Sequence, residues 1–271
     1  MTTTLTILGC GSSGGVPRIG GDWGKCDPLN PKNRRRRCSV LVTKTDGQGT
    51  TRVLIDTSPD MRDQMLEANV QSLDGVLYTH EHADHTHGID ELRAFFLKRR
   101  AKVQVWADEP TGQMLMNRFA YCFYAAPGSD YPPILALNRV VPGKPVSIGG
   151  AGGTITALPF ILHHGNIDAL GFRIGNTAYT PDLNGIPDAS LDALQGLDLW
   201  IVDALKRTPH PSHLSLPETR RWIERLKPTR AIITNMHVDM DFGTLREELP
   251  AHIEPAYDGL AVEISEHKNI P

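Results

Sequence analysis

The residues best suited to chemistry lie in one short segment, Thr79-His80-Glu81-His82-Ala83-Asp84-His85. It follows an apolar run, 75–78, that predicts a strand, and it precedes a helix-like segment, 88–97. Side chains two apart in an extended segment point the same way, so His80 and His82 can hold one metal ion together. Asp84 and His85 follow in the turn and suit a second ion. A chance cluster in a polar loop is the alternative, but only 11 of 271 residues are histidine, so we favour metal binding.

Three later apolar runs also end in residues of metal-ligand type. The residues that follow these runs are, in chain order, the pair His163-His164, Asp182 and His237. Each run predicts a strand that delivers a ligand at its C-terminal end, as the first motif does. This shared placement predicts that the residues converge on one site. The residues themselves leave open whether His163 or His164 is the ligand.

A glycine-rich segment and an arginine run could contact a phosphate. Segment 9–17, which contains Ser13, could bind a phosphate through backbone N–H groups, or it could be a tight turn close to the site. The four arginines of 34–37 either form a solvated charge run or turn inward. In the second case Arg37 is the expected phosphate ligand, because it lies next to the following strand.

Residues at two more strand ends complete the candidate set. Asp56 ends the predicted strand 52–56 and could orient a ligand imidazole, or it could cap the helix that follows. Asp203 ends an apolar strand, and we give it the same supporting role. His210 and His213 come next, before the predicted helix 216–226, and both are candidates for a role in the site.

The composition and the order of elements predict one α/β domain over residues 1–271. Strand 52–56, helix 60–68 and strand 75–78 form a βαβ unit, so we expect a partly parallel sheet. The aromatic and proline-rich segment 119–133 could be a lid, a stacking wall, a core plug or a dimer surface. His252 and His267 have no strand context, and we expect both at the surface.

Charge and hydropathy exclude several functions. The formal net charge is −3 and the hydrophobic fraction is 40%, which is ordinary for a globular protein and unlike a general nucleic-acid binder. We find no signal peptide and no run of about 20 apolar residues, so we expect no membrane partner. Four cysteines without paired spacing are expected to be reduced, and the expected location is cytoplasmic.

The motif order resembles that of the metallo-β-lactamase superfamily over essentially the whole chain. The resemblance implies a four-layer αββα sandwich with a dinuclear metal site at one edge of the two sheets. Within the superfamily the chain most resembles the phosphodiesterase branch, which contains the transfer-RNA 3′-processing endonuclease and the cyclic phosphodiesterase of bacterial phosphonate breakdown. This likeness rests on the glycine-rich start, the Arg-Arg-Arg-Cys-Ser segment ending at Ser39, and His213 followed by Leu214-Ser215.

The resemblance also implies a complete ligand set for two ions. It places His80, His82 and His164 on one ion, Asp84, His85 and His237 on the other, and Asp182 as the bridge. It favours His164 over His163 because His164 directly precedes Gly165, as in that branch. In the branch, a histidine at the place of His213 assists phosphodiester cleavage.

We therefore expect a two-metal hydrolase that cleaves a small cyclic or nucleotide-type phosphodiester with a metal-bound hydroxide. Asp84 and His213 are the expected catalytic residues, and Ser13, Arg37 and His213 the expected substrate contacts. Imidazole ligands favour zinc, and the carboxylates keep manganese open. The alternatives are a thioester or lactam hydrolase and a non-catalytic nucleotide-binding sensor. A large nucleic acid is not expected as partner, and a homodimer stays open.

Overall fold

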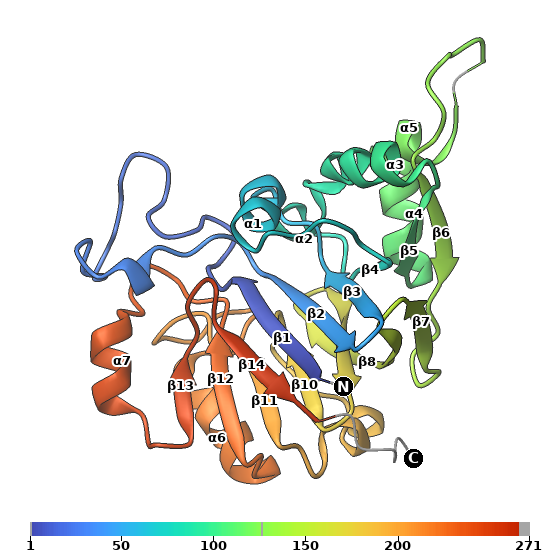
Figure 1. The fold of residues 1–271 in the computed structure, drawn as a ribbon. Coiled ribbons are helices and arrows are strands. Elements are labelled where there is room, and N and C mark those ends of the chain that lie inside the picture. The colour runs from blue at the N-terminus through green and yellow to red at the C-terminus, as the bar shows by residue number, and fades with distance from the viewer. Residues whose placement is uncertain (1, 126, 266–271) are drawn as a thin grey trace.

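Two seven-stranded sheets form the centre of the protein in a computed structural model that describes residues 2–125 and 127–265 (Figure 1). His267 lies outside the described residues. The first sheet has the strand order β14-β1-β2-β3-β4-β5-β6, and the second has the order β13-β12-β11-β10-β9-β8-β7.

The strands of the first sheet come from the N-terminal half of the chain, with one exception at its edge. They are β1 (Thr2–Gly9), β2 (Ser39–Asp46), β3 (Gly49–Ile55), β4 (Gly75–Leu77), β5 (Val103–Ala107), β6 (Leu135–Arg139) and β14 (Ala261–Ile264). Strand β14 pairs antiparallel with β1, and this pairing joins the C-terminal segment to the N-terminal sheet.

The second sheet is built from the C-terminal half. Its strands are β7 (Val146–Gly150), β8 (Gly153–His164), β9 (Ile167–Ile174), β10 (Thr177–Thr180), β11 (Leu199–Asp203), β12 (Arg230–Thr234) and β13 (Ile253–Pro255). Strands β10, β11, β12 and β13 run parallel to one another. Their C-terminal ends therefore lie at the same edge of the sheet.

Helices lie outside both sheets (Figure 1). Those of the first half of the chain are α1 (Met61–Glu67), α2 (Ala83–Thr86), α3 (Arg93–Arg99), α4 (Glu109–Arg118) and α5 (Ala120–Phe123). Those of the second half are α6 (Leu216–Leu226) and α7 (Phe242–Glu248). Short 3₁₀ helices lie at Pro31–Asn33, Ile89–Leu92, Asp188–Ser190 and Asp192–Leu194.

The side chains of the first sheet alternate between its two faces, and each face packs into a different hydrophobic core. Val53 and Ile55 of β3 point into a core shared with residues of the second sheet such as Phe172 and Ile201. Leu54 points the other way, into a core that includes Met61 of α1. Successive side chains of a strand face opposite sides of its sheet, so one strand serves both cores. The fold is thus the predicted four-layer αββα sandwich, and that prediction is confirmed.

The local elements that position the metal motif follow the prediction. Strands β3 and β4 are parallel and α1 connects them, which confirms the βαβ unit. The helix predicted over 88–97 is divided into a 3₁₀ turn and α3. Among the described residues, no helix is long and apolar enough to cross a membrane.

The aromatic segment 119–133 includes α5, and its described residues after α5 project from the molecule before the chain enters β6 (Figure 1). Its described tyrosines, Tyr121, Tyr124 and Tyr131, are all exposed, whereas Cys122 and Phe123 are buried in the hydrophobic core that includes Leu54. His252 is exposed, as predicted, and all four cysteines are free and buried.

Candidate metal centre

The predicted metal motif leaves β4 at Leu77 and meets residues from three strands of the other sheet. His164 ends β8, Asp182 follows β10 and Asp203 ends β11. Since β10 and β11 are parallel, Asp182 and Asp203 lie at the same edge. The two sheets therefore bring residues far apart in sequence to one place.

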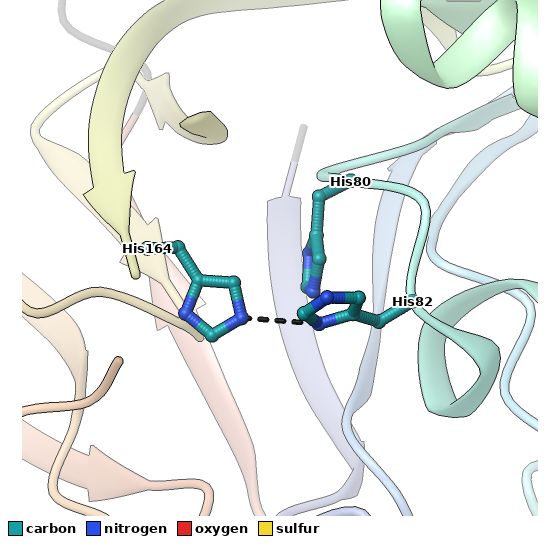
Figure 2. Close-up of side chains that lie close together, drawn as sticks. All are labelled: His80, His82 and His164. Atoms are coloured by element: carbon teal, nitrogen blue, oxygen red, sulfur yellow. Dashed lines mark hydrogen bonds between the residues drawn. The ribbon is translucent and has the colours of Figure 1, made fainter. Parts of the chain in front are cut away.

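Three imidazoles form one group that could hold an ion. Figure 2 shows His80 and His82 on the segment after β4, facing His164 at the end of β8. His164 Nε2 lies 3.1 Å from His82 Nδ1, and the ring of His80 lies 4.9 Å from the ring of His164. The exposed His163 instead pairs with Asp168 at 3.1 Å. The structure thus brings His164, and not His163, to this group.

A second group contains His80, His85 and Asp182. His85 Nε2 lies 3.1 Å from Asp182 Oδ1, and His80 Nε2 lies 3.9 Å from Asp182 Oδ2. Asp84 Oδ2 lies 3.5 Å from His85 Nε2. Asp182 adjoins both groups, because its Oδ2 also lies 3.7 Å from His164 Nε2.

Buried atoms without partners show that these residues fit metal ions. His80 Nε2, His85 Nε2 and Asp182 Oδ1 are buried and have no hydrogen-bond partner within the described residues. A buried polar atom without a partner costs roughly 1–3 kcal/mol. Imidazole and carboxylate ligands around a divalent ion would remove that cost, and they are the donor set that zinc and manganese accept.

Other contacts orient the imidazoles of the cluster. The buried carboxylate of Asp56 accepts hydrogen bonds from Thr79 N at 2.8 Å and Thr79 Oγ1 at 2.7 Å, and His85 Nδ1 lies 2.7 Å from it. This pairing directs His85 Nε2 toward Asp182. His164 Nδ1 donates to Ser212 O at 2.6 Å, which leaves its Nε2 toward His82. Such partners fix the ring orientation of metal ligands. Asp60, not Asp56, is the N-cap residue of α1.

His213 and Asp203 form a pair beside the cluster. His213 Nδ1 lies 2.9 Å from Asp203 Oδ2 and 3.8 Å from Asp182 Oδ2. Burial alone would lower the pKa of His213, but the charge of Asp203 and the hydrogen bond to it raise the pKa to about 9. Burial raises the pKa of Asp203. His213 can therefore carry a proton at neutral pH while its ring position stays fixed.

The structure does not bring His237 into these groups. Its Nδ1 faces Asp239 Oδ1 at 3.3 Å, and its Nε2 contacts the guanidinium of Arg18. The residue that faces the cluster from the end of β12 is Asn235, which is buried and has a positive φ of 58°. Asn235 Nδ2 donates to Pro181 O at 3.1 Å and lies 3.2 Å from His213 Nδ1.

The predicted phosphate contacts lie in different places. Ser13 is exposed and lines a cavity of about 420 Å³ over the metal cluster. Arg37 forms a salt bridge with Asp60 at 2.8 Å and lies outside the lining of this cavity. Arg18 and Lys206 line it instead, together with Ser12, Gly14, His82, Asp84, His164, Asp182, Leu205, His210, Ser212, His213, Asn235 and His237.

Sequence reasoning missed Arg18, Lys206 and Asn235. Arg18 begins a long loop without periodicity, and nothing in that loop marks it. Lys206 follows β11 and precedes His210 and His213, so its closeness to two candidate histidines was the available signal. Asn235 directly follows β12, where a strand end could have drawn attention to it.

A family model described as "Beta-lactamase superfamily domain" matches residues 51–236, more than half of the chain. The chain belongs to the metallo-β-lactamase superfamily. The matched region contains the metal motif and the ends of β8, β10 and β12.

Two curated relatives share sequence with this member of the superfamily. An octanoyltransferase of Porphyromonas gingivalis is 33% identical over 265 residues, which cover 96% of this chain and 51% of that protein. A ribonuclease Z of Deinococcus radiodurans is 31% identical over 81 residues, 30% of this chain and 24% of that protein. The match therefore spans about half the length of the first relative and about a quarter of the second.

Solved structures support the same assignment. The crystal structure of a diphosphatase from the PhnP family is 37% identical, has a TM-score of 0.87, and the match covers 97% of this chain and 98% of that chain. Zn²⁺-bound PqqB from Methylobacterium extorquens is 16% identical, with a TM-score of 0.74 and coverage of 96% and 100%. The short form of human tRNase Z is 15% identical, with a TM-score of 0.65 and coverage of 97% and 99%. The last two show the shared fold.

Proposed function

We propose that this protein hydrolyses a small phosphodiester or diphosphate diester, of cyclic or nucleotide type, with two divalent ions. The observation that carries the proposal is the buried cluster of His80, His85 and Asp182, whose partnerless atoms face one another beside a paired His213. The likeness to a diphosphatase of the PhnP family supports the phosphorus substrate. The name of the octanoyltransferase belongs to a protein about twice as long, so it does not assign an activity to this chain.

The ligands would divide between two ions that share Asp182. His80, His82 and His164 would hold one ion, and His85 with Asp84 would hold the other. Zinc or manganese held there would supply an activated nucleophile and would offset negative charge on the phosphoryl oxygens.

The chain's own residues would bind and orient the substrate. The cavity of about 420 Å³ over the cluster is large enough for a small diester, and Ser13 lies at its wall. Small-molecule sites are usually concave and of this order of size. A cavity of this volume favours a small substrate over a large nucleic acid.

His213 would donate a proton to the leaving oxygen. Asp203 holds His213 Nδ1 at 2.9 Å, and its charge and hydrogen bond raise the pKa of the imidazole. General acid catalysis of this kind contributes roughly 10²–10⁴-fold to the rate. Asp203 acts through His213 and is a positioning residue.

The first test is hydrolysis of bis(p-nitrophenyl) phosphate by metal-stripped protein reloaded with zinc or manganese. We expect turnover that requires metal and falls about 10²–10⁴-fold in His213→Ala. His252→Ala is the matched control, because His252 is an exposed histidine outside the cavity. Turnover of a thioester or a β-lactam, with none of the diester, would contradict the proposal.

A further inference from the structure

One imidazole of the metal cluster is held differently from the others. Three of the four candidate ligand imidazoles have a ring nitrogen within hydrogen-bond distance of a residue outside the ligand set. The pairs are His80 with Thr79 at 3.0 Å, His85 with Asp56 at 2.7 Å and His164 with Ser212 at 2.6 Å. Within the described residues, the ring of His82 has hydrogen-bond geometry only with His164, itself a candidate ligand. His82 is also the one exposed imidazole of these four, so its position depends on how its backbone is held.

Hydrogen bonds hold the peptide groups on both sides of His82. The group that follows it is held within the metal motif, because His82 O accepts from Thr86 Oγ1 at 2.9 Å and from His85 N at 3.1 Å. The group that precedes it is held by a distant residue, since Glu81 O accepts from Arg118 Nη1 at 2.6 Å. A charged donor makes a shorter and stronger hydrogen bond than a neutral one. Arg118 therefore fixes the peptide group that joins Glu81 to His82.

Arg118 is the last residue of α4, and the junction of α4 and α5 lies against the metal motif. Phe119 N bonds to Leu115 O at 2.8 Å, and the Phe119 side chain packs against the hydrophobic core that contains Leu115. The ring of Phe119 also lies 5.4 Å from the ring of His87, edge to face. His87 is the C-cap residue of α2, so the junction contacts the metal motif at two points. The backbone of Arg118 is thus well fixed beside the motif.

The side chain of Glu81 lines a different cavity from that of the cluster. This cavity has a volume of about 510 Å³ and lies beside α4 and the β8–β9 hairpin. Glu81 lies outside the lining of the cavity over the cluster, which includes His82. Successive side chains of an extended segment point to opposite sides, which explains the difference. Glu81 therefore contributes to the metal centre through its carbonyl group.

We propose that Arg118 is a positioning residue for the metal centre. It holds Glu81 O and thereby places His82 for the ion that His80, His82 and His164 would bind. The inference rests on the proposed function, because it requires ions at this cluster. An exposed charged contact adds little to the stability of a fold. A ligand that is already in place loses less freedom when it binds, and residues that position metal ligands change metal affinity by roughly 10–100-fold.

The experiment measures zinc affinity by titration of metal-stripped protein against a competing chelator. Arg118→Met keeps an unbranched side chain but cannot donate, so one of the two binding steps should weaken by about tenfold and the other by much less. Arg118→Lys should recover most of the affinity, because an ammonium group can donate to the same carbonyl. Asn117→Ala is the matched control, because Asn117 is exposed and lies next to Arg118 in α4.

Two further measurements separate positioning from a structural role. The visible spectrum of cobalt-loaded protein reports ligand geometry, and it should change in Arg118→Met and return toward the wild type in Arg118→Lys. The urea midpoint of metal-free protein should be the same in the wild type and both variants. Unchanged zinc affinity in Arg118→Met would overturn the inference, and so would an equal loss in Arg118→Lys or Asn117→Ala. A lower urea midpoint in Arg118→Met would assign the residue a structural role and would also overturn it.

These outcomes are distinct from failure of the proposed function. A protein whose zinc affinity depends on Arg118 but which hydrolyses no diester would contradict only the hydrolysis. A protein that hydrolyses diesters with metal, and whose zinc affinity is the same in Arg118→Met, would contradict only this inference. A wild type that binds no ion would contradict both.

Discussion

His85 Nε2 and Asp182 Oδ1 lie 3.1 Å apart at the junction of the two sheets. Both atoms are buried, and neither has a partner with hydrogen-bond geometry within the described residues. Asp56 already holds the other nitrogen of His85 at 2.7 Å. An imidazole nitrogen and a carboxylate oxygen that face each other in this way suit a shared cation better than a hydrogen bond.

Removal of Asp182 should affect both ions. Its carboxylate lies within 4 Å of His80, His85 and His164, so Asp182→Ala removes a ligand that the two groups share. We expect the bound metal to fall from two ions to one or none per chain. Asp168→Ala is the control, because Asp168 is an exposed carboxylate that pairs with His163. Two ions retained in Asp182→Ala would contradict the bridging role.

The two adjacent histidines at the end of β8 give a sharper comparison. His164 is 2% exposed and faces His82, whereas His163 is exposed and faces Asp168. His164→Ala should lose metal, because it removes one of three imidazoles from a group, and His163→Ala should keep it. Mass spectrometry of the purified variants measures this. Equal metal content in the two variants would argue against the first group as an ion site.

The pKa of His213 should depend on Asp203. Burial lowers this pKa, but the charge of Asp203 and the hydrogen bond to it outweigh burial and raise it to about 9. In metal-free protein the imidazole should therefore stay protonated at neutral pH and lose its proton as the pH rises through about 9. Asp203→Asn should lower the pKa toward or below about 6.5. Histidine chemical shifts in an NMR pH titration report both values.

The protonation of His213 should also make the stability of the folded protein depend on pH. Because the folded pKa of His213 lies above its unfolded value, protonation of His213 contributes stability to metal-free protein fully below about pH 6.5, and this contribution is lost as the pH rises through about 9. An unchanged pKa of His213 in Asp203→Asn would show that Asp203 does not raise this pKa.

Asp241 should stabilise the fold away from the site. It is the N-cap of α7, and its carboxylate accepts hydrogen bonds from Thr244 N at 2.9 Å, Asp27 N at 3.1 Å and Asn33 Nδ2 at 2.6 Å. Burial would raise its pKa, but these bonds lower it to about 2. Asp241→Ala should cost about 1 kcal/mol at pH 7, after allowance for solvent screening.

The pH dependence of that cost has a definite sign. A depressed carboxyl pKa gives stability that is complete above the unfolded value of about 4 and is lost as the pH falls through about 2. The difference between wild type and Asp241→Ala in urea unfolding should therefore narrow between pH 5 and pH 3. A constant difference over this range would show that the cost comes from packing alone.

The metal motif and the βαβ unit could be predicted because their signals are local, whereas the four-layer sandwich was expected from the resemblance to the superfamily. One short segment, in which the chain passes from a strand to a turn, contains His80, His82, Asp84 and His85. The two strands and the helix of the βαβ unit follow one another directly in the sequence. The pairing of β14 with β1 joins the two ends of the chain, and no local pattern specifies such a contact. The segment 119–133 was ambiguous because aromatic residues are common in cores and on surfaces alike, and its described part has both, with Phe123 buried and Tyr124 exposed.

At the end of β12, the local sequence pattern does not predict the direction in which the chain turns. His237 is the first residue of ligand type after this strand, and the sequence alone predicts that it joins the cluster. The chain instead turns at Asn235, whose φ is 58°, and Met236 N bonds to Cys10 O at 2.8 Å. This turn directs His237 toward Arg18. Arg37 is a similar case, because its partner Asp60 lies on a different element.

The central claim is that the His/Asp cluster holds ions that hydrolyse a phosphodiester. The most direct test is the rate of bis(p-nitrophenyl) phosphate hydrolysis by stripped protein as zinc or manganese is added back. We predict no turnover without metal, a rate that rises until two ions are bound per chain, and almost none in Asp182→Ala. Two bound ions with no turnover of this or any other diester would contradict the claim.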